Sequence, residues 1–369
     1  MIDVMTRVTI AVQPRPYDAW IESGLLARAG TLLRDILPEK KHLFVITVPP
    51  VRRKWGKKLE RALAAADFKA TLILVREGET SKKLATVEQL GEKLAKAGAD
   101  RNSGVIAFGG GVVGDVAGLL ASLYMRGVDV IQIPTTVVAQ VDASIGGKTG
   151  VNLRAGKNLL GTFHQPRAVL IDPEVLSSLP EREFRSGLYE ALKCGVIGKP
   201  GLFHQFEENK SQILKRDPAV LERLIIDSVE LKAAVVSADE RENGLRRVLN
   251  LGHTVGHALE AETRYHSLLH GEAVAWGMVA ATNIALSMGR TDSVTAGRIT
   301  DAVLGLGHLP RVNVASRKIL GRLKNDKKTR NGVVHFILPR EVGKVDVVEG
   351  VPEQLVIASV DELRRLSGT

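Results

Sequence analysis

Short apolar runs alternate with amphipathic stretches through the first half of the chain. Apolar residues at helical spacing predict helices at residues 24–36, 51–66 and 82–97. Runs rich in β-branched residues predict strands at residues 8–12, 43–48, 71–75, 105–108, 130–133 and 168–171. Strands that alternate with longer helices in this way indicate βαβ units and a mainly parallel sheet.

The pattern changes after Asp172. From residue 180 to about residue 307 the chain has an almost wholly helical pattern, and strand-like sequence returns only at residues 333–338 and 344–348. Pro180 suits the first turn of a helix. We therefore expect an α/β domain at residues 1–179, with a mainly parallel sheet, followed by a mostly α-helical domain at residues 180–369. Two domains of this kind often bind a ligand in the cleft between them.

The composition is that of a globular protein, with 44% hydrophobic and 25% charged residues. Aromatic residues make up only 4%, which argues against a stacking surface for single-stranded nucleic acid. The net charge of +10 fits either a nucleic-acid or membrane partner, or cations gathered around an anionic small molecule. The densest basic stretch, residues 52–61, lies on a predicted amphipathic helix with Leu59 and Leu63 facing inward, so a solvated helix face is the better interpretation there.

The chain has a single cysteine, Cys194, which excludes an internal disulfide and fits a reducing compartment. Its first residues lack the features of a secretory signal. No apolar run approaches the roughly 18 residues that a membrane span needs. We expect a soluble, cytoplasmic protein.

A glycine motif follows the predicted strand at residues 105–108. Gly109, Gly111 and Gly114 satisfy G-x-G-x-x-G between a strand and a helix, the context in which this motif cradles the phosphates of a dinucleotide. Glycine-rich βα turns also serve close packing, so the motif alone does not decide. It also occurs in a late βα unit, whereas the usual dinucleotide fold carries it in the first.

The segment REGETSKK lies upstream of this motif. Glu79 could accept hydrogen bonds from ribose hydroxyls, and Lys82 could meet a phosphate. The alternative is a charged loop in which Thr80 or Ser81 caps the following helix. Taken by itself, this sequence favours the capping interpretation.

Histidines and a glutamate in the helical half suggest a metal site. His253 and His257 are four residues apart and face the same side of a helix, His270 precedes another helical run, and Glu190 lies in an amphipathic helix. Nitrogen and oxygen ligands from different helices suit zinc or a similar divalent ion. The residues leave open which two histidines join Glu190, and spacing favours His253 with His257.

Residues 133–166 form a glycine-rich segment with several polar side chains. Two glycine-flanked lysines beside an aspartate and an asparagine favour an anion-binding role over a flexible loop with solvated charges. A Walker-type loop is excluded, because Asp142 stands where the glycine five residues before Gly147 would be needed. The candidate residues are Thr135, Thr136, Asp142, Lys148, Lys157 and Asn158.

These segments together resemble one family. GGGVVGD, YMRG, IPTTVVAQVDASIGGKTGVN, GKNLLGTFHQP, LPEREFRSGLYEALKCG, ELKAAVVSADERENGLRRVLNLGHTVGHALE, LLHGEAVAWGM and NDKK resemble the motifs of the 3-dehydroquinate synthases and occur in the same order. The resemblance is nearly continuous from about residue 78 to residue 328, and the residues before it resemble the family only in pattern. Strings this long and chemically unusual are highly specific.

The resemblance implies an N-terminal nucleotide-binding α/β domain, a helical C-terminal domain, NAD, a divalent metal (zinc or cobalt) and a homodimer. It implies that Glu190, His253 and His270 hold the metal, which differs from the pairing that spacing favours. Val48 stands where the family usually has Asp or Asn, which puts one NAD contact in doubt. The implied NAD contacts are Glu79, Lys82, Gly110, Gly111, Val112, Val113, Gly114, Asp115, Thr135, Thr136, Lys148, Lys157, Val175, Leu176, Ser177 and Ser178.

The resemblance also implies a substrate, 3-deoxy-D-arabino-heptulosonate 7-phosphate. The family converts it to 3-dehydroquinate and phosphate by NAD-mediated oxidation, phosphate elimination, re-reduction, ring opening and intramolecular aldol closure. Arg126, in YMRG, would reach the site of the neighbouring subunit. The implied substrate contacts are Asp142, Lys148, Asn158, Lys193, Lys232, Arg246, Asn250, His257 and one of Lys327 and Lys328.

Three other functions compete with this one. A polyol dehydrogenase shares the glycine turn and the helical histidines, but it has no need for the lysine and arginine set. A related cyclase acting on a substrate without a carboxylate should lack the carboxylate partners, yet Lys232, Arg246, Asn250 and His257 are present. A nucleic-acid-binding protein rests on net charge alone.

Overall fold

The computed structural model describes residues 5–263, 267–329 and 334–368, and it leaves the side chains of residues 325–329 undescribed. The chain divides into two compact units. The first unit is Met1–Pro180 with Leu221–Glu240, and the second is Glu181–Val220 with Arg241–Thr369. The first unit is thus interrupted after Pro180, close to the predicted domain boundary. The prediction did not assign the later segment, Leu221–Glu240, to the first unit.

The first unit is built on a seven-stranded sheet with the order β1-β2-β9-β6-β5-β3-β4. Only β1 and β2 pair antiparallel, and the other neighbours are parallel, which confirms the predicted α/β class with a mainly parallel sheet. The strands are β1 Thr6–Ile10, β2 Tyr17–Ile21, β3 His42–Thr47, β4 Lys69–Leu74, β5 Gly104–Gly109, β6 Asp129–Pro134 and β9 Ala168–Ile171.

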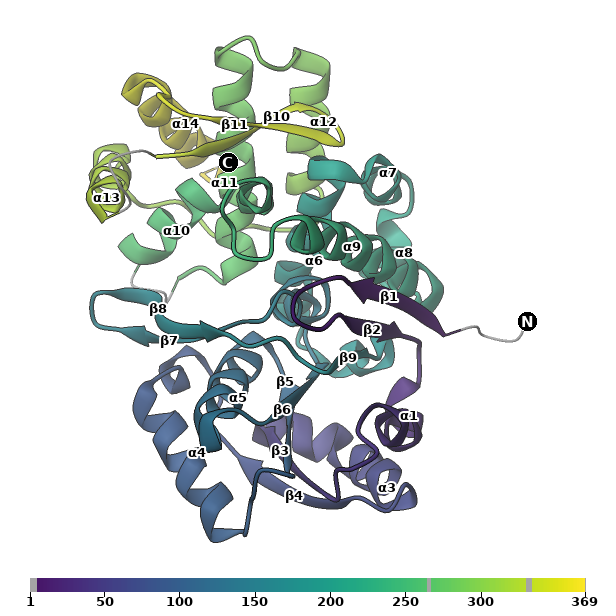
Figure 1. The fold of residues 1–369 in the computed structure, drawn as a ribbon. Coiled ribbons are helices and arrows are strands. Elements are labelled where there is room, and N and C mark those ends of the chain that lie inside the picture. Colours follow the sequence, from purple (N-terminus) through teal and green to yellow (C-terminus); the bar gives the residue numbers. More distant parts are fainter. Residues whose placement is uncertain (1–4, 264–266, 330–333, 369) are drawn as a thin grey trace. The chain divides into compact units, whose positions relative to one another are not determined.

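Helices cover both faces of this sheet (Figure 1). Successive residues of a strand point to opposite faces, so Phe44 and Ile46 of β3 join one apolar cluster and Leu43 and Val45 join the other. The first cluster is completed by α4 and α5, and the second by α1 and α3. The helices and turns of this unit are η1 Leu25–Arg28, α1 Ala29–Ile36, α2 Pro49–Val51, η2 Arg52–Gly56, α3 Lys57–Ala65, η3 Glu79–Ser81, α4 Leu84–Lys96, α5 Gly111–Leu123, η4 Tyr124–Arg126, η5 Ala139–Ala143 and η6 Pro173–Ser178.

The glycine-rich segment is structured rather than a flexible loop. After η5 it forms a hairpin of β7 Lys148–Leu153 and β8 Gly156–Phe163. The two strands cross closely at Gly161, where a methyl group would lie 1.9 Å from the Thr149 carbonyl oxygen. The hairpin is joined to α5 by a hydrogen bond of 2.9 Å from Thr162 Oγ1 to Ser122 Oγ.

The second unit is mostly helical, as predicted. Its helix α11 is apolar along most of its length and packs against α6, α10, α12 and α14. The elements are α6 Glu181–Gly198, α7 Pro200–Glu208, α8 Lys210–Leu214, η7 Leu245–Asn250, α10 His253–Glu262, α11 His270–Ser287, α12 Ser293–Leu304, α13 Ser316–Thr329, β10 Phe336–Glu341, β11 Lys344–Val348 and α14 Glu353–Leu366. Helix α9, Pro218–Ala238, begins in the second unit and continues into the first. Among the residues that the structure describes, no helix combines the length and apolar character needed to cross a bilayer.

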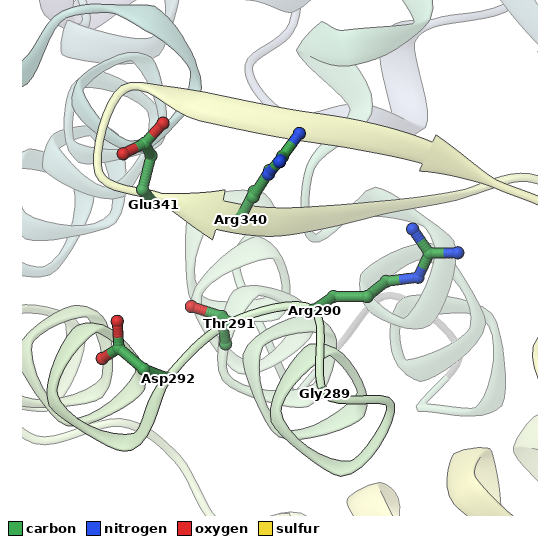
Figure 2. Close-up of a pocket in the computed structure, with 6 residues that line it drawn as sticks. All are labelled: Gly289, Arg290, Thr291, Asp292, Arg340 and Glu341. Carbon is green, nitrogen blue, oxygen red and sulfur yellow. The ribbon is translucent and has the colours of Figure 1, made fainter.

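One surface pocket of the second unit lies at the turn between α11 and α12, beside β10 (Figure 2). It has a volume of about 440 Å³. Arg290 and Arg340 line it together with Asp292 and Glu341, so its charges are mixed. The residues that line it include none of the predicted site residues.

Candidate active site

Glycines allow three helices of the second unit to meet closely. A methyl group on Gly271 of α11 would lie 1.8 Å from the Ser186 carbonyl oxygen of α6. A methyl group on Gly277 would lie 1.8 Å from the carbonyl oxygen of Gly252, the residue before α10. Any larger residue at these two positions would force the helices apart. The close approach brings together side chains from α6, α10 and α11.

Glu190, His253 and His270 converge where these helices meet. Their ligand atoms all lie within 4.8 Å of one another. The Nε2 atom of His270 lies 3.3 Å from Glu190 Oε1, and that of His253 lies 3.7 Å from the same oxygen. Both imidazoles therefore direct Nε2 toward the carboxylate.

The Nδ1 atoms of these two histidines make separate contacts. His253 Nδ1 lies 3.1 Å from the Leu251 carbonyl oxygen, which can only accept, so this nitrogen donates. His270 Nδ1 lies 3.3 Å from Glu260 Oε2. Contacts of this kind orient a ligating imidazole and leave the Nε2 lone pair available.

Glu190 is fully buried, and neighbouring cationic groups offset its charge. Lys193, one turn along α6 and also buried, places Nζ 2.6 Å from Glu190 Oε2. Burial raises the pKa of Glu190, but Lys193, His270 and His253 outweigh burial and hold that pKa well below its usual range. Neither carboxylate oxygen accepts a hydrogen bond of good geometry, although both have cationic groups at ion-pair distance. Such an oxygen pair is suited to a metal ligand.

The two imidazoles differ in protonation. Burial and the neighbouring Lys193 hold the pKa of His253 well below its usual range, so this ring is neutral. Burial also disfavours charge on His270, but the neighbouring carboxylates of Glu190 and Glu260 raise its pKa to about 10. These three side chains fit a zinc or cobalt ion. Glu190 offers a carboxylate, His253 a neutral imidazole, and His270 an imidazole that can release its proton when a cation binds.

His257 does not belong to the group around Glu190. It is exposed on α10, and it forms a second group with Glu260 and His270. Its ring centroid lies 5.1 Å from that of His253. The pairing that spacing favoured, His253 with His257, is therefore not the pair that converges on Glu190.

Other predicted residues of the second unit lie on elements near this group. Arg246 is buried in η7, which packs against α6. Asn250, at the end of η7, donates a hydrogen bond of 2.7 Å from Nδ2 to Glu242 Oε1. Lys327 and Lys328 fall in α13, but their side chains lie outside the described residues.

The glycine motif of the first unit occupies the predicted strand–helix junction. Strand β5 ends at Gly109 and α5 begins at Gly111. A methyl group on Gly110 would lie 3.0 Å from Thr136 Cγ2, so this turn faces the residues that follow β6. The Thr135 amide donates to the Gly109 carbonyl across the ends of these neighbouring strands, at 3.0 Å. The motif and the threonine pair thus lie together at the carboxyl ends of two central strands, β5 and β6.

The segment upstream of the motif does not cap a helix. Helix α4 begins at Leu84 with Lys83 as its N-cap and has no side-chain cap, so the capping interpretation of Thr80 and Ser81 is wrong. Ser81 Oγ instead donates to the Arg76 carbonyl at 2.6 Å. Tertiary partners determine this conformation, because the segment's charged side chains bond to other parts of the unit.

Two of those charged side chains bond to predicted site elements. Lys82 is buried and forms an ion pair with Asp115 in the first turns of α5. Burial raises the pKa of Asp115, and Lys82 partly opposes that rise. Glu79 Oε1 accepts a hydrogen bond of 2.7 Å from Asn152 of β7. The structure thus joins residues 79–82 to both the glycine turn and the hairpin.

The remaining predicted residues of the first unit lie on several elements. Asp142 in η5 accepts from Lys232 of α9, whose Nζ lies 2.5 Å from Oδ1 and 2.6 Å from the Asp142 carbonyl oxygen. Lys148 begins β7, and Lys157 and Asn158 lie on β8. Val175, Leu176, Ser177 and Ser178 lie in η6, Arg126 ends η4, and Val48 follows β3 as the N-cap of α2.

Comparison with known proteins decides the family. Residues 72–186 match the model of the 3-dehydroquinate synthase N-terminal domain, and residues 187–329 match that of the C-terminal domain. A 3-dehydroquinate synthase from Koribacter versatilis (strain Ellin345) is 55% identical over 98% of this chain and 99% of its own. The chain belongs to the 3-dehydroquinate synthase family. A second member, from Solibacter usitatus (strain Ellin6076), is 46% identical over 96% of this chain and 99% of its own.

Solved structures of other enzymes have a fold similar to that of this 3-dehydroquinate synthase family member. The 2-epi-5-epi-valiolone synthase ValA of Streptomyces hygroscopicus, with NAD⁺ and Zn²⁺ bound, matches with a TM-score of 0.88 and 32% identity, over 96% of this chain and 99% of its own. A 2-deoxy-scyllo-inosose synthase complexed with carbaglucose-6-phosphate, NAD⁺ and Co²⁺ matches with a TM-score of 0.85 and 26% identity, over 97% and 99%. An iron-containing alcohol dehydrogenase shares the fold alone, with a TM-score of 0.70 and 15% identity over 98% and 99%.

Proposed function

We propose that this protein catalyses the 3-dehydroquinate synthase reaction, a phosphate-eliminating carbon–oxygen lyase reaction that converts 3-deoxy-D-arabino-heptulosonate 7-phosphate to 3-dehydroquinate and phosphate. One observation supports it above the others. In this chain, which belongs to the 3-dehydroquinate synthase family, the buried carboxylate of Glu190 meets the imidazoles of His253 and His270. The three side chains come from separate helices, and both imidazoles direct Nε2 toward the carboxylate.

We propose that Glu190, His253 and His270 hold zinc or cobalt in the second unit. In the first unit, NAD would bind the glycine turn, with Glu79 accepting from ribose hydroxyls and Lys82 near the phosphates. The complexes of similar enzymes with NAD⁺ and with Zn²⁺ or Co²⁺ support both cofactors. When bound, NAD supplies hydride transfer and the metal polarises the ring oxygen that is oxidised.

The cationic side chains would bind the two anionic groups of the substrate. We propose that Lys148 and Asn158, with Lys327 or Lys328, hold the phosphate, and that Arg246 with Asn250 holds the carboxylate. Each charge-assisted hydrogen bond of this kind contributes roughly 1.5–3 kcal/mol. Burial of Arg246 supports its role, because a desolvated guanidinium binds a carboxylate more strongly than an exposed one.

Three further residues would position the ring and move protons. Asp142 and Lys193 would orient ring hydroxyls. His257 would carry protons to and from the substrate, because it is exposed while the two neighbouring imidazoles are directed at Glu190. Its accessibility to water suits proton exchange during ring opening and aldol closure.

A related cyclase that makes a cyclitol is the second candidate, because the similar structures include a 2-epi-5-epi-valiolone synthase and a 2-deoxy-scyllo-inosose synthase. The buried Arg246 argues for a substrate that carries a carboxylate. The test is phosphate release from the heptulosonate phosphate and from a heptulose phosphate without the carboxylate, with NAD and metal each omitted in turn.

We expect release only from the carboxylate substrate, dependence on both cofactors, no net NADH, and large losses in Lys148→Ala and Arg246→Ala. Wild-type rates in both variants would contradict the assigned anion contacts. Preference for the substrate without a carboxylate would favour the cyclitol-forming enzyme, and net NADH would favour a dehydrogenase.

A homodimer is also proposed, with Arg126 reaching the partner's site. Exposed apolar side chains near η4 and on the β7–β8 hairpin support self-association, namely Leu123, Met125, Leu159, Leu160 and Phe163. Sedimentation of the purified protein tests it, and a monomer at micromolar concentration would contradict it. A cytoplasmic location stays a prediction from the sequence.

A further inference from the structure

Asn152 lies at an irregularity in the β7–β8 hairpin. The register of the ladder shifts between Val151 and Leu153, on either side of this residue. Such a bulge removes one residue from regular pairing and redirects its backbone and side chain. The Asn152 amide donates a hydrogen bond of 2.8 Å to the Lys82 carbonyl. The bulge thus ties the hairpin to the segment that carries two proposed NAD contacts.

The side chain of Asn152 uses both ends of its amide. Nδ2 donates to Glu79 Oε1 at 2.7 Å, and Oδ1 accepts from the backbone amide of Asn158 at 2.9 Å. A carboxylate can only accept and a backbone N–H can only donate, so these partners determine the orientation of the amide. A side chain of this length must have both a donor and an acceptor to make the two bonds.

The bond to Asn158 holds an unusual backbone conformation. Asn158 has a φ of 57°, in the left-handed region that few residues other than glycine adopt readily. Asn158 is a proposed phosphate contact, and its neighbour Lys157 is a proposed NAD contact. Their backbone is therefore held by the same side chain that holds Glu79.

We infer that Asn152 is a positioning residue that holds the carboxylate of Glu79 and the backbone of residues 157–158 in the arrangement that binds NAD. The inference rests on the proposed function, in which Glu79 meets the ribose of NAD. Asn152 acts through these partners and is assigned no contact with either ligand. Cofactor affinity thus depends on a hydrogen bond between the hairpin and η3.

A purely structural role in the hairpin would have different consequences. If Asn152 only stabilised the hairpin, loosening the hairpin elsewhere would weaken NAD binding equally. Thr162 provides that comparison, since its hydroxyl bonds to Thr149 Oγ1 at 2.8 Å and to Ser122 Oγ at 2.9 Å. This residue pair lies outside the bulge in the regular part of the ladder. Thr162→Val removes these bonds and leaves the contacts of Asn152 in place.

The charge of Glu79 provides a second distinction. Asn152→Asp replaces the donor beside Glu79 with a second carboxylate, so it should weaken NAD binding more than Asn152→Ala. Adding Glu79→Gln restores a donor–acceptor pair in the reverse direction, because the amide introduced at position 79 can donate to the carboxylate introduced at position 152. Recovery in this double variant would arise only from a direct interaction between the two positions.

The experiment is calorimetric titration of NAD into the metal-loaded wild-type protein, Asn152→Ala, Asn152→Asp, Glu79→Gln, the double variant and Thr162→Val. We expect the dissociation constant to rise about tenfold in Asn152→Ala, since a hydrogen bond to a charged group is lost. We expect a larger rise in Asn152→Asp, recovery in the double variant relative to Asn152→Asp, and a change of less than about twofold in Thr162→Val.

Equal affinities in the wild type and Asn152→Ala would overturn the inference, as would an equal loss in Thr162→Val. If the single Asn152 variants do not fold, the double variant is compared with Glu79→Gln, which controls for the lost charge at position 79. Much weaker NAD binding by the double variant than by Glu79→Gln would then overturn the inference. Absence of NAD binding by the wild type would instead contradict the proposed function.

Discussion

The buried ion pair of α6 allows a prediction that does not depend on catalysis. Glu190→Gln keeps the shape of the side chain but removes the charge that lies 2.6 Å from Lys193 Nζ. The side chains of Glu190 and Lys193 are 0% and 2% exposed, so water cannot replace the lost carboxylate. A buried ammonium without its counter-charge destabilises the folded state strongly, by about 3–5 kcal/mol.

An independent limit gives a similar value. The buried ammonium of the variant can release its proton, and deprotonating a lysine with an unfolded pKa near 10.4 at pH 7.5 costs about 4 kcal/mol. The loss in free energy of unfolding should therefore not exceed roughly 4 kcal/mol at this pH. Because the folded variant would then bind fewer protons than the unfolded chain, its stability should rise as the pH increases from about 7.5 toward about 10.

The assay is equilibrium unfolding in urea of the metal-free protein, with a chelator present throughout. Glu190→Gln combined with Lys193→Met should recover most of the loss, because the variant then has no buried charge at this position. The matched control is Glu353→Gln, which breaks a half-exposed pair of 2.7 Å with Lys324 and should cost less than about 1 kcal/mol. A loss below about 1 kcal/mol in Glu190→Gln, or a larger loss that does not change with pH, would show that the pair is not desolvated as described.

Three further predictions concern packing, pH and metal. Gly277→Ala forces a methyl group onto the Gly252 carbonyl, so we expect the free energy of unfolding in urea to fall by about 1–3 kcal/mol. Because Gly252 precedes His253, zinc binding measured by chelator competition should also weaken. Gly297→Ala, with open space around its Cβ, should change neither quantity. Burial raises the pKa of Asp172 above its unfolded value despite hydrogen bonds from backbone amides, so its contribution to stability is present at low pH and is lost as the pH rises above about 4. The free energy of unfolding of the wild type relative to that of Asp172→Asn should therefore fall as the pH rises above about 4. A rise in this difference would contradict the assigned direction of the pKa shift. Free zinc at 100 times its dissociation constant should stabilise the wild type by about 2.7 kcal/mol, and no shift in the unfolding curve would count against a metal site.

Regular patterns in the sequence predict most of the sheet and the helical half. The strands β3, β5, β6 and β9 are short, mostly apolar and almost wholly buried, and such runs are distinctive. Strand β2, Tyr17–Ile21, was not predicted. Its residues Tyr17, Ala19 and Ile21 are buried and Asp18 and Trp20 are half-buried, and its pairing with β1 and β9 is not visible in so short a segment of sequence.

The β7–β8 hairpin could not be predicted from local propensity. Its sequences KTGVNL and GKNLLGTF contain glycines and polar residues that are typical of loops. The glycines are there for close approach, because Gly161 faces the Thr149 carbonyl. The requirement arises between segments that meet only in the folded chain, and a single sequence does not display it.

The metal group shows what spacing can and cannot give. Helical spacing places His253 and His257 on one face, but it contains no information on how α10 packs against α11. The orientation is set by Gly252 and Gly277, where backbone meets backbone. The family resemblance names His270, which lies beside Glu190 in the structure. Helical spacing names His257, which belongs to another group.

The path of α9 has a consequence for how the protein is made. Backbone amides of Ala11 and Ser23 donate to Ser237 and Glu222 of this late segment, at 2.8 and 2.9 Å. A nascent chain released from the ribosome only as far as residue 180 would carry all the strands of the parallel sheet but not the helix that these amides bond to. Folding of the first unit therefore finishes only after residue 240 has been translated, when part of the second unit has already emerged.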